Sequence, residues 1–263
     1  MRIVVCVKHV PDATASRSFA ASDGTVDRAG ADGLLSELDE YAVEEALRIA
    51  GDSGGEVTVL TIGPEPALDA TRKALQMGAD AAVHVVDDAM HGSDALATSR
   101  VLAAAVARIG ADSPVDVVLC GMASTDGAMG VVPAMLAERL DLPALTYAAD
   151  VVVDGDTVTV RRDGDVATET VAASLPVLVS VTDQINEPRY PSFKGIMAAK
   201  KKPVETWSLS DLGVEADQVG LSAAWSTVRE VQARPPRTQG TVVTDEGDGG
   251  TRLAAYLAEQ KFV

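Results

Sequence analysis

Four short apolar runs, separated by helical patterns, restrict what this chain can fold into more than any other feature. The runs are nearly continuous in Val, Ile, Leu and Ala rather than alternating, and they occupy residues 3–7, 57–62, 82–86 and 115–120. A strand buried on both faces shows this pattern, because neither face meets water. Their alternation with helices predicts an α/β fold in which a parallel sheet is covered by helices on both faces.

The segments between these runs have the apolar spacing of amphipathic helices. One-sided apolar patterns recur over residues 39–50, 67–77, 93–109 and 131–140. Such a stripe is what a helix needs in order to pack on a sheet. Ser93 is the expected N-cap of the longest helix, and Gly110 follows its end, in keeping with the preferences of Ser and Gly for these positions.

The pattern changes to strict alternation after residue 150. Residues 151–153 and 157–161 flank the turn Asp154-Gly155-Asp156, and residues 166–172 form a third alternating segment. Alternation of this kind predicts antiparallel strands with one solvated face, which we expect as a hairpin at an edge of the sheet. Residues 176–181 then return to a buried apolar run.

Composition divides the chain into two expected parts. Residues 1–203 carry the α/β pattern, whereas residues 204–263 are looser and include a polar run at 244–250. The chain nevertheless ends in an amphipathic helical pattern at residues 252–262. An apolar helix on an extended arm needs a surface to pack on, which is either its own core or a second chain, and we expect a second chain.

The charge and the cysteines narrow the function classes. A net charge of −17 argues against a nucleic-acid-binding surface, because phosphates would be repelled, but it permits one nucleotide held by backbone N–H groups. Cys6 and Cys120 lie within apolar runs and are expected to be buried free thiols. His9, His84 and His91 are scattered, so we expect no metal site. The short, early-charged N-terminal strand does not suit a signal peptide, and no apolar run could span a membrane, so we expect a cytoplasmic protein.

Residues 186–202 (NEPRYPSFKGIMAAKKK) are the most distinctive segment of the chain. They hold five of its 22 basic residues and one acid, Glu187, and they include Tyr190 and Phe193 in a chain with only three Phe. Two prolines bar a helix at the start, while the residues from Gly195 onward suit a short helix with cations at its C-terminal end. An exposed aromatic beside a small basic helix is typical of a docking element. A solvated, lysine-tailed surface helix remains open as the alternative.

The loop after the fourth apolar run is the strongest candidate for a ligand site. Ligands of a parallel sheet bind beyond the carboxyl ends of its strands. Here Gly121, Gly127 and Gly130 allow close approach of the backbone, Ser124 and Thr125 offer hydroxyls, and Asp126 could accept a hydrogen bond. The N-terminus of the following helix would point free N–H groups at this loop, as in a phosphate site. No Lys or Arg lies between residues 121 and 138, so amides and hydroxyls would hold a small phosphate; a plain glycine-rich turn is the alternative.

The sequence shows no arrangement of residues typical of an active site. It has no nucleophile elbow, no paired-carboxylate motif and no zinc-ligand spacing. The chain is therefore expected to be a binding or carrier subunit without catalytic residues of its own.

At four places the sequence resembles the small (β) subunit of electron transfer flavoproteins, and together these places span nearly the whole chain. They are residues 6–12 (CVKHVPD), 39–46 (DEYAVEEA), 161–165 (RRDGD) leading through Glu169 to 175–179 (LPVLV), and the segment 186–202. This resemblance implies a Rossmann-like sheet of the adenine nucleotide α-hydrolase type, here within residues 1–203. It also implies a heterodimer in which residues 204–263 form an arm that docks on the larger α subunit.

The resemblance further implies which cofactors and partners the chain serves. One FAD would lie mainly in the α subunit, near the interface, and the β subunit would hold one AMP. Electrons would pass from flavin dehydrogenases, such as the acyl-CoA dehydrogenases of fatty acid oxidation, to a membrane quinone oxidoreductase. Segment 186–202 would anchor the dehydrogenases through Tyr190, Phe193, Ile196 and Met197, with Phe193 in place of the usual Leu.

The family's AMP contacts fall on strand ends and on the glycine-rich loop. By position they match Cys6, Ile62, Gly63, Gly121, Ala123, Ser124, Thr125, Asp126, Gly127 and Gly130.

Several positions depart from the family pattern. Ser36 replaces an Asn that contacts AMP in relatives, and Leu38 replaces a Phe near the flavin ring. Met129 and Val131 stand where the loop often has Gln and Thr. Two alternatives stay open: a bifurcating flavoprotein subunit with a second FAD in place of AMP, and a stand-alone adenine-nucleotide sensor of the same fold, which would also account for the glycine-rich loop.

Overall fold

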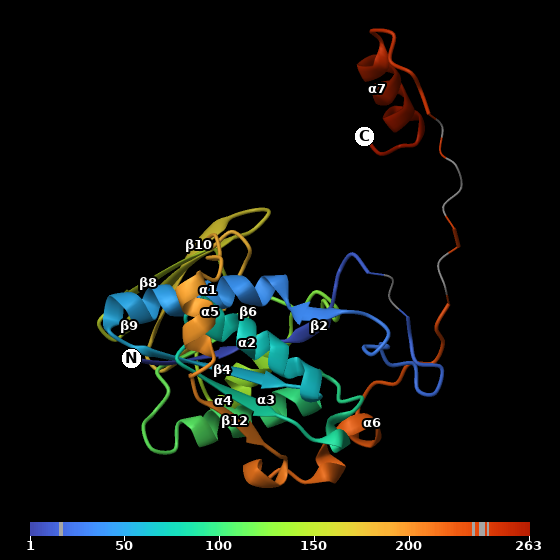
Figure 1. The fold of residues 1–263 in the computed structure, drawn as a ribbon. Helices are drawn as coiled ribbons and strands as arrows, with labels where there is room; N and C mark the ends of the chain where they lie inside the picture. Colours follow the sequence, from blue (N-terminus) through green and yellow to red (C-terminus); the bar gives the residue numbers. More distant parts are fainter. Residues whose placement is uncertain (16–17, 233–234, 237–239, 241) are drawn as a thin grey trace. The chain divides into compact units, whose positions relative to one another are not determined.

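A seven-stranded sheet forms the centre of the chain in the computed structural model (Figure 1). The structure describes residues 1–15, 18–232, 235–236, 240 and 242–263. Every pair of neighbouring strands in this sheet is parallel, in the order β12-β5-β4-β1-β6-β11-β7. The predicted α/β fold with a parallel sheet is thereby confirmed. The strands are β1 (Arg2–Cys6), β4 (Glu56–Ile62), β5 (Ala81–Val85), β6 (Val117–Gly121), β7 (Ala144–Ala148), β11 (Val177–Val181) and β12 (Val204–Trp207).

Helices cover both faces of this sheet because its central strands bury side chains in both directions. On β1, Ile3 and Val5 point into a core shared with α1 and α2, while Val4 points into a second core shared with α3 and α4. This two-sided burial explains why the central strands appear in the sequence as continuous apolar runs. The helices are α1 (Glu37–Ser53), α2 (Leu68–Met77), α3 (Ala95–Ile109) and α4 (Val132–Leu140).

The N-cap of α3 differs from the expected residue. Asp94, not Ser93, caps this helix, and its carboxylate accepts a hydrogen bond from the backbone N–H of Ala97 at 2.9 Å. The Ser93 hydroxyl instead accepts from the N–H of Gly220 at 2.8 Å. Ser and Asp are both favourable N-cap residues. Because the Ser93 hydroxyl bonds the distant Gly220, Asp94 caps the helix.

The antiparallel strands also lie elsewhere than expected. They form a separate three-stranded sheet, β10-β9-β8, rather than an edge of the parallel sheet. Val158 and Val160 of β9 pack into the core on the α1 and α2 side, so this small sheet covers part of the same face. Its strands are β8 (Asp150–Asp154), β9 (Thr157–Asp163) and β10 (Thr168–Ser174), and a further pair near the N-terminus consists of β2 (His9–Pro11) and β3 (Gly33–Leu35).

The C-terminal residues divide between two units. The first compact unit runs from Met1 to Arg229 and the second from Glu230 to Val263. Residues 204–207, which the sequence analysis assigned to the arm, form β12 in the parallel sheet, and the helix expected near the end is α7 (Gly249–Glu259). Residues 233–234, 237–239 and 241 of the expected arm lie outside the described part of the chain. The remaining short helices are α5 (Phe193–Ala199), α6 (Gly220–Ala223) and the 3-10 turns η1 (Glu65–Ala67), η2 (Asp88–Met90), η3 (Ser210–Leu212) and η4 (Ala216–Gln218).

In the described ranges, no helix combines the length and the apolar character that crossing a bilayer requires.

The order of the strands fixes where a ligand crevice belongs. From β1 the chain continues to β4 and β5 on one side, and β6 then starts the other side of the sheet. The sequence connections therefore leave in opposite directions from β1 and β6, which are neighbours. In open α/β sheets a crevice forms beyond the carboxyl ends of strands at such a switch point.

Truncating a side chain at the centre of the sheet is expected to destabilise the fold strongly. Leu119 on β6 is fully buried between neighbouring strands and helices. Leu119→Ala is therefore expected to lower the free energy of unfolding by about 2–5 kcal/mol, measured by urea denaturation. Val166→Ala, at a side chain that is 99% exposed, is the matched control and should leave the midpoint unchanged. A similar midpoint for both variants would contradict the central position of β6.

Candidate functional site

A cluster of three charged side chains lies at the carboxyl ends of β1 and β6. Asp126, in the loop after β6, accepts a hydrogen bond from Lys8 Nζ at 2.9 Å through Oδ1, and its Oδ2 accepts from Arg28 Nη2 at 2.5 Å. The Asp126 side chain is only 2% exposed, so two cations compensate one buried carboxylate. Lys8 Nζ also lies 3.4 Å from the Ser124 hydroxyl. Lys8, Arg28 and Asp126 together carry one net positive charge.

These contacts control the ionisation of Asp126. Burial alone would raise the pKa of this carboxyl, but the charge of Lys8 and the hydrogen bonds from Lys8, Arg28 and Ser124 hold the pKa well below its usual range. The carboxylate is thus charged at every physiological pH, and it keeps Lys8 and Arg28 in place.

Asp39 joins the two strand ends to the first helix. Its carboxylate accepts hydrogen bonds from the backbone N–H of Lys8, at 2.8 Å, and from that of Gly121. A Cβ atom at Gly121 would lie 2.6 Å from Asp39 Oδ1 and 2.8 Å from the Leu38 carbonyl oxygen, so only glycine allows this approach. The strand ends and the start of α1 are consequently held as one unit.

The ionisation of Asp39 is strongly perturbed. Burial is the main cause and raises the pKa of Asp39 from 3.8 to about 7, although the hydrogen bonds from Lys8 and Gly121 act in the opposite direction. The nearby negative charge of Asp126 also raises it. Near neutral pH, Asp39 therefore exchanges a proton.

Ser36 presents an unused hydroxyl at the same place. It precedes α1 at the N-cap position, yet its side chain makes no capping hydrogen bond. Its backbone N–H donates to the Lys8 carbonyl at 2.9 Å, which places it beside the end of β1. The Ser36 Oγ atom is buried and has no hydrogen-bond partner within the described structure. Buried hydroxyls normally have partners, which include ordered water, so this one is available to a water or to a polar group of a ligand.

The glycine-rich loop is shaped by its own backbone. The N–H of Gly127 donates to Asp126 Oδ1 at 2.7 Å and to Ser124 Oγ at 3.3 Å. Gly130 adopts a φ of 66°, and a Cβ there would lie 2.5 Å from the Tyr147 hydroxyl. Ala123 and Thr125 are partly buried within the same loop.

The remaining expected nucleotide contacts lie on the same edge of the sheet. Cys6 ends β1 opposite Cys120 of β6, and Ile62 ends β4, the neighbour of β1 on its other side. Both cysteines are free thiols, and the adjacent Cys6 thiol together with burial raises the pKa of Cys120. Gly63 follows Ile62, and its carbonyl oxygen lies 2.9 Å from His84 Nε2. The expected contacts therefore converge on the carboxyl ends of three adjacent strands, together with Ser36 and Leu38 at the start of α1.

Sequence reasoning missed the cations of this site. It expected a phosphate to meet only amides and hydroxyls, because the loop itself has no Lys or Arg. The structure corrects this, since Lys8 and Arg28 reach the loop from the N-terminal part of the chain. The position of Lys8 just past the first apolar run predicts that it lies at this edge, but not that it contacts the glycine-rich loop, and nothing in the pattern around Arg28 indicates its position.

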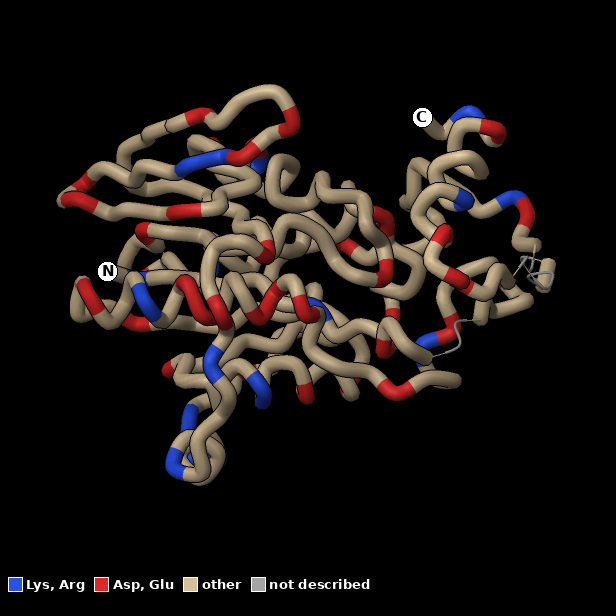
Figure 2. Tube along the Cα trace, turned by 90° about the horizontal axis from the view of Figure 1, so that it is seen from above, with Lys and Arg blue, Asp and Glu red and all other residues tan. Residues whose placement is uncertain are grey.

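The expected docking residues form a separate surface. In segment 186–202 the Ser192 hydroxyl accepts from the N–H of Gly195 at 3.0 Å and caps α5. Tyr190 and Phe193 are 93% and 81% exposed, and Ile196 and Met197 lie beside them on α5 with partial exposure. Figure 2 shows several Lys and Arg positions on and beside a projecting helical turn, at the place of α5, while Asp and Glu positions are spread along much of the remaining trace.

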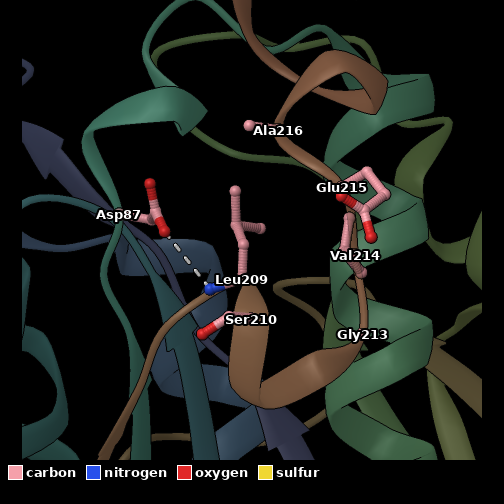
Figure 3. Close-up of a pocket in the computed structure, with 7 residues that line it drawn as sticks. All are labelled: Asp87, Leu209, Ser210, Gly213, Val214, Glu215 and Ala216. Carbon is pink, nitrogen blue, oxygen red and sulfur yellow. Dashed lines mark hydrogen bonds between the residues drawn. The ribbon is translucent and has the colours of Figure 1, made fainter.

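Two shallow hollows are separate from the cluster of Lys8, Arg28 and Asp126. One, of about 360 Å³, lies between the start of α1 and the docking segment and includes Leu38, Tyr41 and Tyr190 in its wall. The other, of about 320 Å³, is shown in Figure 3. The described residues of its wall include the carboxylates of Asp87 and Glu215 and no cation, and Asp87 accepts from the N–H of Leu209 at 3.3 Å. This second hollow contains none of the expected site residues. In the described residues, no group of three or more His, Cys, Asp or Glu is placed to hold a metal ion.

Comparison with known proteins gives consistent matches. The family model described as electron transfer flavoprotein domain matches residues 23–212. The chain is 49% identical over 266 residues to the electron transfer flavoprotein subunit beta of Mycobacterium tuberculosis, covering 99% of both chains. It is 35% identical to the subunit of the same name from Megasphaera elsdenii, covering 99% of this chain and 97% of the relative. It is also 36% identical to the caffeyl-CoA reductase-Etf complex subunit CarD of Acetobacterium woodii, with coverage of 93% and 92%.

The raised pKa of the buried Asp39 carboxyl is expected to make the free energy of unfolding depend on pH. Between pH 3.8 and about 7 the folded chain keeps a proton on this group that the unfolded chain has lost. Rising pH in this window therefore favours unfolding, by about 1.4 kcal/mol per pH unit from this one group, and the contribution is constant above it. Asp39→Asn removes this dependence, so the unfolding free energy of the variant relative to the wild type should rise from pH 4 to pH 7. Denaturant titrations at several pH values measure this difference, and a pH-independent difference would contradict the raised pKa.

Proposed function

The chain belongs to the electron transfer flavoprotein family, among its β subunits, and we propose that it binds AMP and completes the FAD site of a heterodimeric electron carrier. Membership among the β subunits implies an α-subunit partner, a flavin in the complex, and electron transfer as the function of that complex. The finer proposal is that electrons come from flavin dehydrogenases, such as acyl-CoA dehydrogenases in fatty acid oxidation, and leave to a membrane quinone oxidoreductase. The chain would act in the cytoplasm, with no catalytic residues of its own.

One observation carries the proposed nucleotide site. At the switch point of the sheet, the buried Ser36 Oγ has no hydrogen-bond partner among the described residues, and the backbone of Ser36 bonds that of Lys8, which belongs to a cluster with one net positive charge. A nucleotide has the matching groups, namely a polar sugar or base and an anionic phosphate. Lys8, Ser124 and the amides of the glycine-rich loop would hold the phosphate, while Ser36, Cys6, Ile62 and Gly63 would hold the adenosine.

The proposed role of AMP follows from what these residues do. A ligand that binds the folded chain and not the unfolded one stabilises the fold by mass action. The crevice lies at the ends of β1 and β6 and beside the loop before α4. A nucleotide there would contact strands on both sides of the switch point and so stabilise their packing. This chain would supply one wall of the flavin pocket through Leu38, and the electrons would move on the flavin.

Counting bound nucleotides tests this proposal directly. The chain is purified with its α subunit, the complex is denatured, and the released nucleotides are quantified by chromatography. Equal amounts of AMP and FAD are expected. Two FAD molecules per heterodimer and no AMP would instead support a bifurcating flavoprotein. An adenine nucleotide without any flavin would support the stand-alone sensor.

Removing the ammonium group of Lys8 is expected to weaken the AMP site selectively. In Lys8→Met the buried Asp126 keeps Arg28 alone, and this cluster of side chains loses its net positive charge. The AMP content of the purified heterodimer should fall severalfold at unchanged FAD. Lys73→Met is the matched control, because Lys73 pairs with Glu40 on α1 rather than with a residue of the crevice. An AMP content equal to that of the control would mean that amides alone hold the phosphate.

Truncation of the exposed aromatic tests the proposed docking role. Phe193→Ala removes an apolar anchor that makes little contact within its own chain. A residue of this kind at the centre of an interface contributes about 2 kcal/mol, or roughly thirtyfold in affinity. Electron transfer from an acyl-CoA dehydrogenase should slow at sub-saturating protein concentration while the flavin content stays constant. Rates equal to those of Val152→Ala, on the separate antiparallel sheet, would refute the anchor role.

A further inference from the structure

The base of the docking segment is bound to α1 by one carboxylate. Glu44 accepts three hydrogen bonds from Arg189: from Nε at 2.7 Å, from Nη2 at 2.8 Å, and from the backbone N–H at 3.1 Å. Two of these form the parallel fork that arginine makes with a carboxylate, and the third fixes the backbone as well as the side chain. This geometry has little freedom, because both planar groups and one peptide are aligned together.

The burial of the two partners differs. The Glu44 side chain is 8% exposed and that of Arg189 is 46% exposed. A carboxylate so far from water needs a partner. The half-exposed guanidinium of Arg189, in contrast, could be hydrated by water without this ion pair. The preference of Glu44 for a partner therefore holds the docking segment on the helix.

Other contacts restrict the same segment at both of its ends. At the start, Asn186 Nδ2 donates to the Tyr41 carbonyl and to Glu45 Oε2, both at 3.1 Å. At the end, Lys202 Nζ donates to three carbonyl oxygens at the C-terminus of α2, those of Leu75, Gly78 and Ala79. The exposed Tyr190 and Phe193 lie between these two attachments, so the segment is a preformed projection rather than a free loop.

Helix α1 carries both the crevice and the docking segment. Asp39 in its first turn binds the ends of β1 and β6, and Glu44 and Glu45, farther along the same helix, bind the docking segment. A rigid helix therefore sets the position of the exposed aromatic residues relative to the cofactor edge.

We propose that Glu44 and Arg189 are positioning residues for electron transfer: their ion pair fixes the docking segment on α1 and presents Tyr190 and Phe193 to the dehydrogenase in a preformed arrangement. This inference rests on the proposed function, since docking by this segment is itself part of that proposal. Ordering a flexible loop on binding costs conformational entropy and so lowers the affinity. A preformed segment avoids this cost when the dehydrogenase binds. Loss of the ion pair should therefore raise KM for the carrier and leave kcat nearly constant.

The test uses the purified heterodimer and an acyl-CoA dehydrogenase that reduces the wild-type carrier. Glu44→Gln keeps the shape of the side chain but removes its charge, and Arg189→Gln removes the fork. For each, KM should rise about tenfold, which corresponds to about 1.4 kcal/mol, with kcat within about twofold and FAD content unchanged. Arg189→Lys should recover part of the loss, because one charged hydrogen bond remains. The double variant should be no worse than either single variant, as expected for two residues that act through one contact.

A second measurement reports the segment itself. Trypsin cleavage after Lys194 and Lys200, followed by mass spectrometry, should accelerate in Glu44→Gln at constant thermal unfolding temperature. Asp69→Asn, which removes the exposed Asp69–Arg72 pair of α2, is the matched control and should change neither KM nor cleavage. If Glu44→Gln does not fold, Arg189→Lys carries the test, because it keeps a cation beside the buried carboxylate of Glu44.

The outcomes separate the two proposals. A wild-type KM in the Arg189 and Glu44 variants, together with a raised KM in Phe193→Ala, would overturn the positioning role and leave docking intact. A wild-type KM in Phe193→Ala as well would overturn docking by this segment. A fall in kcat at constant KM would also contradict the inference, because it would place the ion pair in the electron-transfer step rather than in docking.

Discussion

The buried carboxylate of Asp39 is the interaction on which the arrangement of the candidate site depends. It binds backbone N–H groups at the ends of the two central strands from the first turn of α1. A single side chain thus joins the segment after β1 and the end of β6 to the start of α1 at the switch point. The crevice, the glycine-rich loop and the helix that carries the docking segment all take their positions from this contact. Burial makes the contact costly when Asp39 is ionised, which explains its raised pKa.

Most of the parallel sheet could be predicted, because buried strands need apolar residues on both faces. The two strands at the edges of the sheet were missed for the opposite reason. In β12 three of four residues are exposed, and in β7 burial alternates irregularly, so neither forms a continuous apolar run. The N-cap of α3 could not be resolved either, since the choice between Ser93 and Asp94 is made by Gly220, 127 residues away from Ser93. Sequence patterns report local burial, whereas these features depend on distant partners.

The same limit applies to the candidate site. Glycines and hydroxyls of one loop are adjacent in sequence, so their grouping was visible. Arg28 and Asp126 are 98 residues apart, and their pairing depends on the path of the segment between β2 and β3. The hydroxyl of Ser36 posed a different difficulty. Its position before a helix is that of an ordinary N-cap, and only the structure shows that it makes no capping bond.

The linear order of these elements has a consequence for the newly made chain. Helix α1, both central strands and the loop of Asp126 all lie within the first 130 residues, whereas segment 186–202 follows two further strands of the parallel sheet. Because synthesis proceeds from the N-terminus, the ribosome releases every residue of the crevice before it releases the basic projection. The nascent polypeptide thus has the components of its ligand cleft while the surface for electron donors is still being translated.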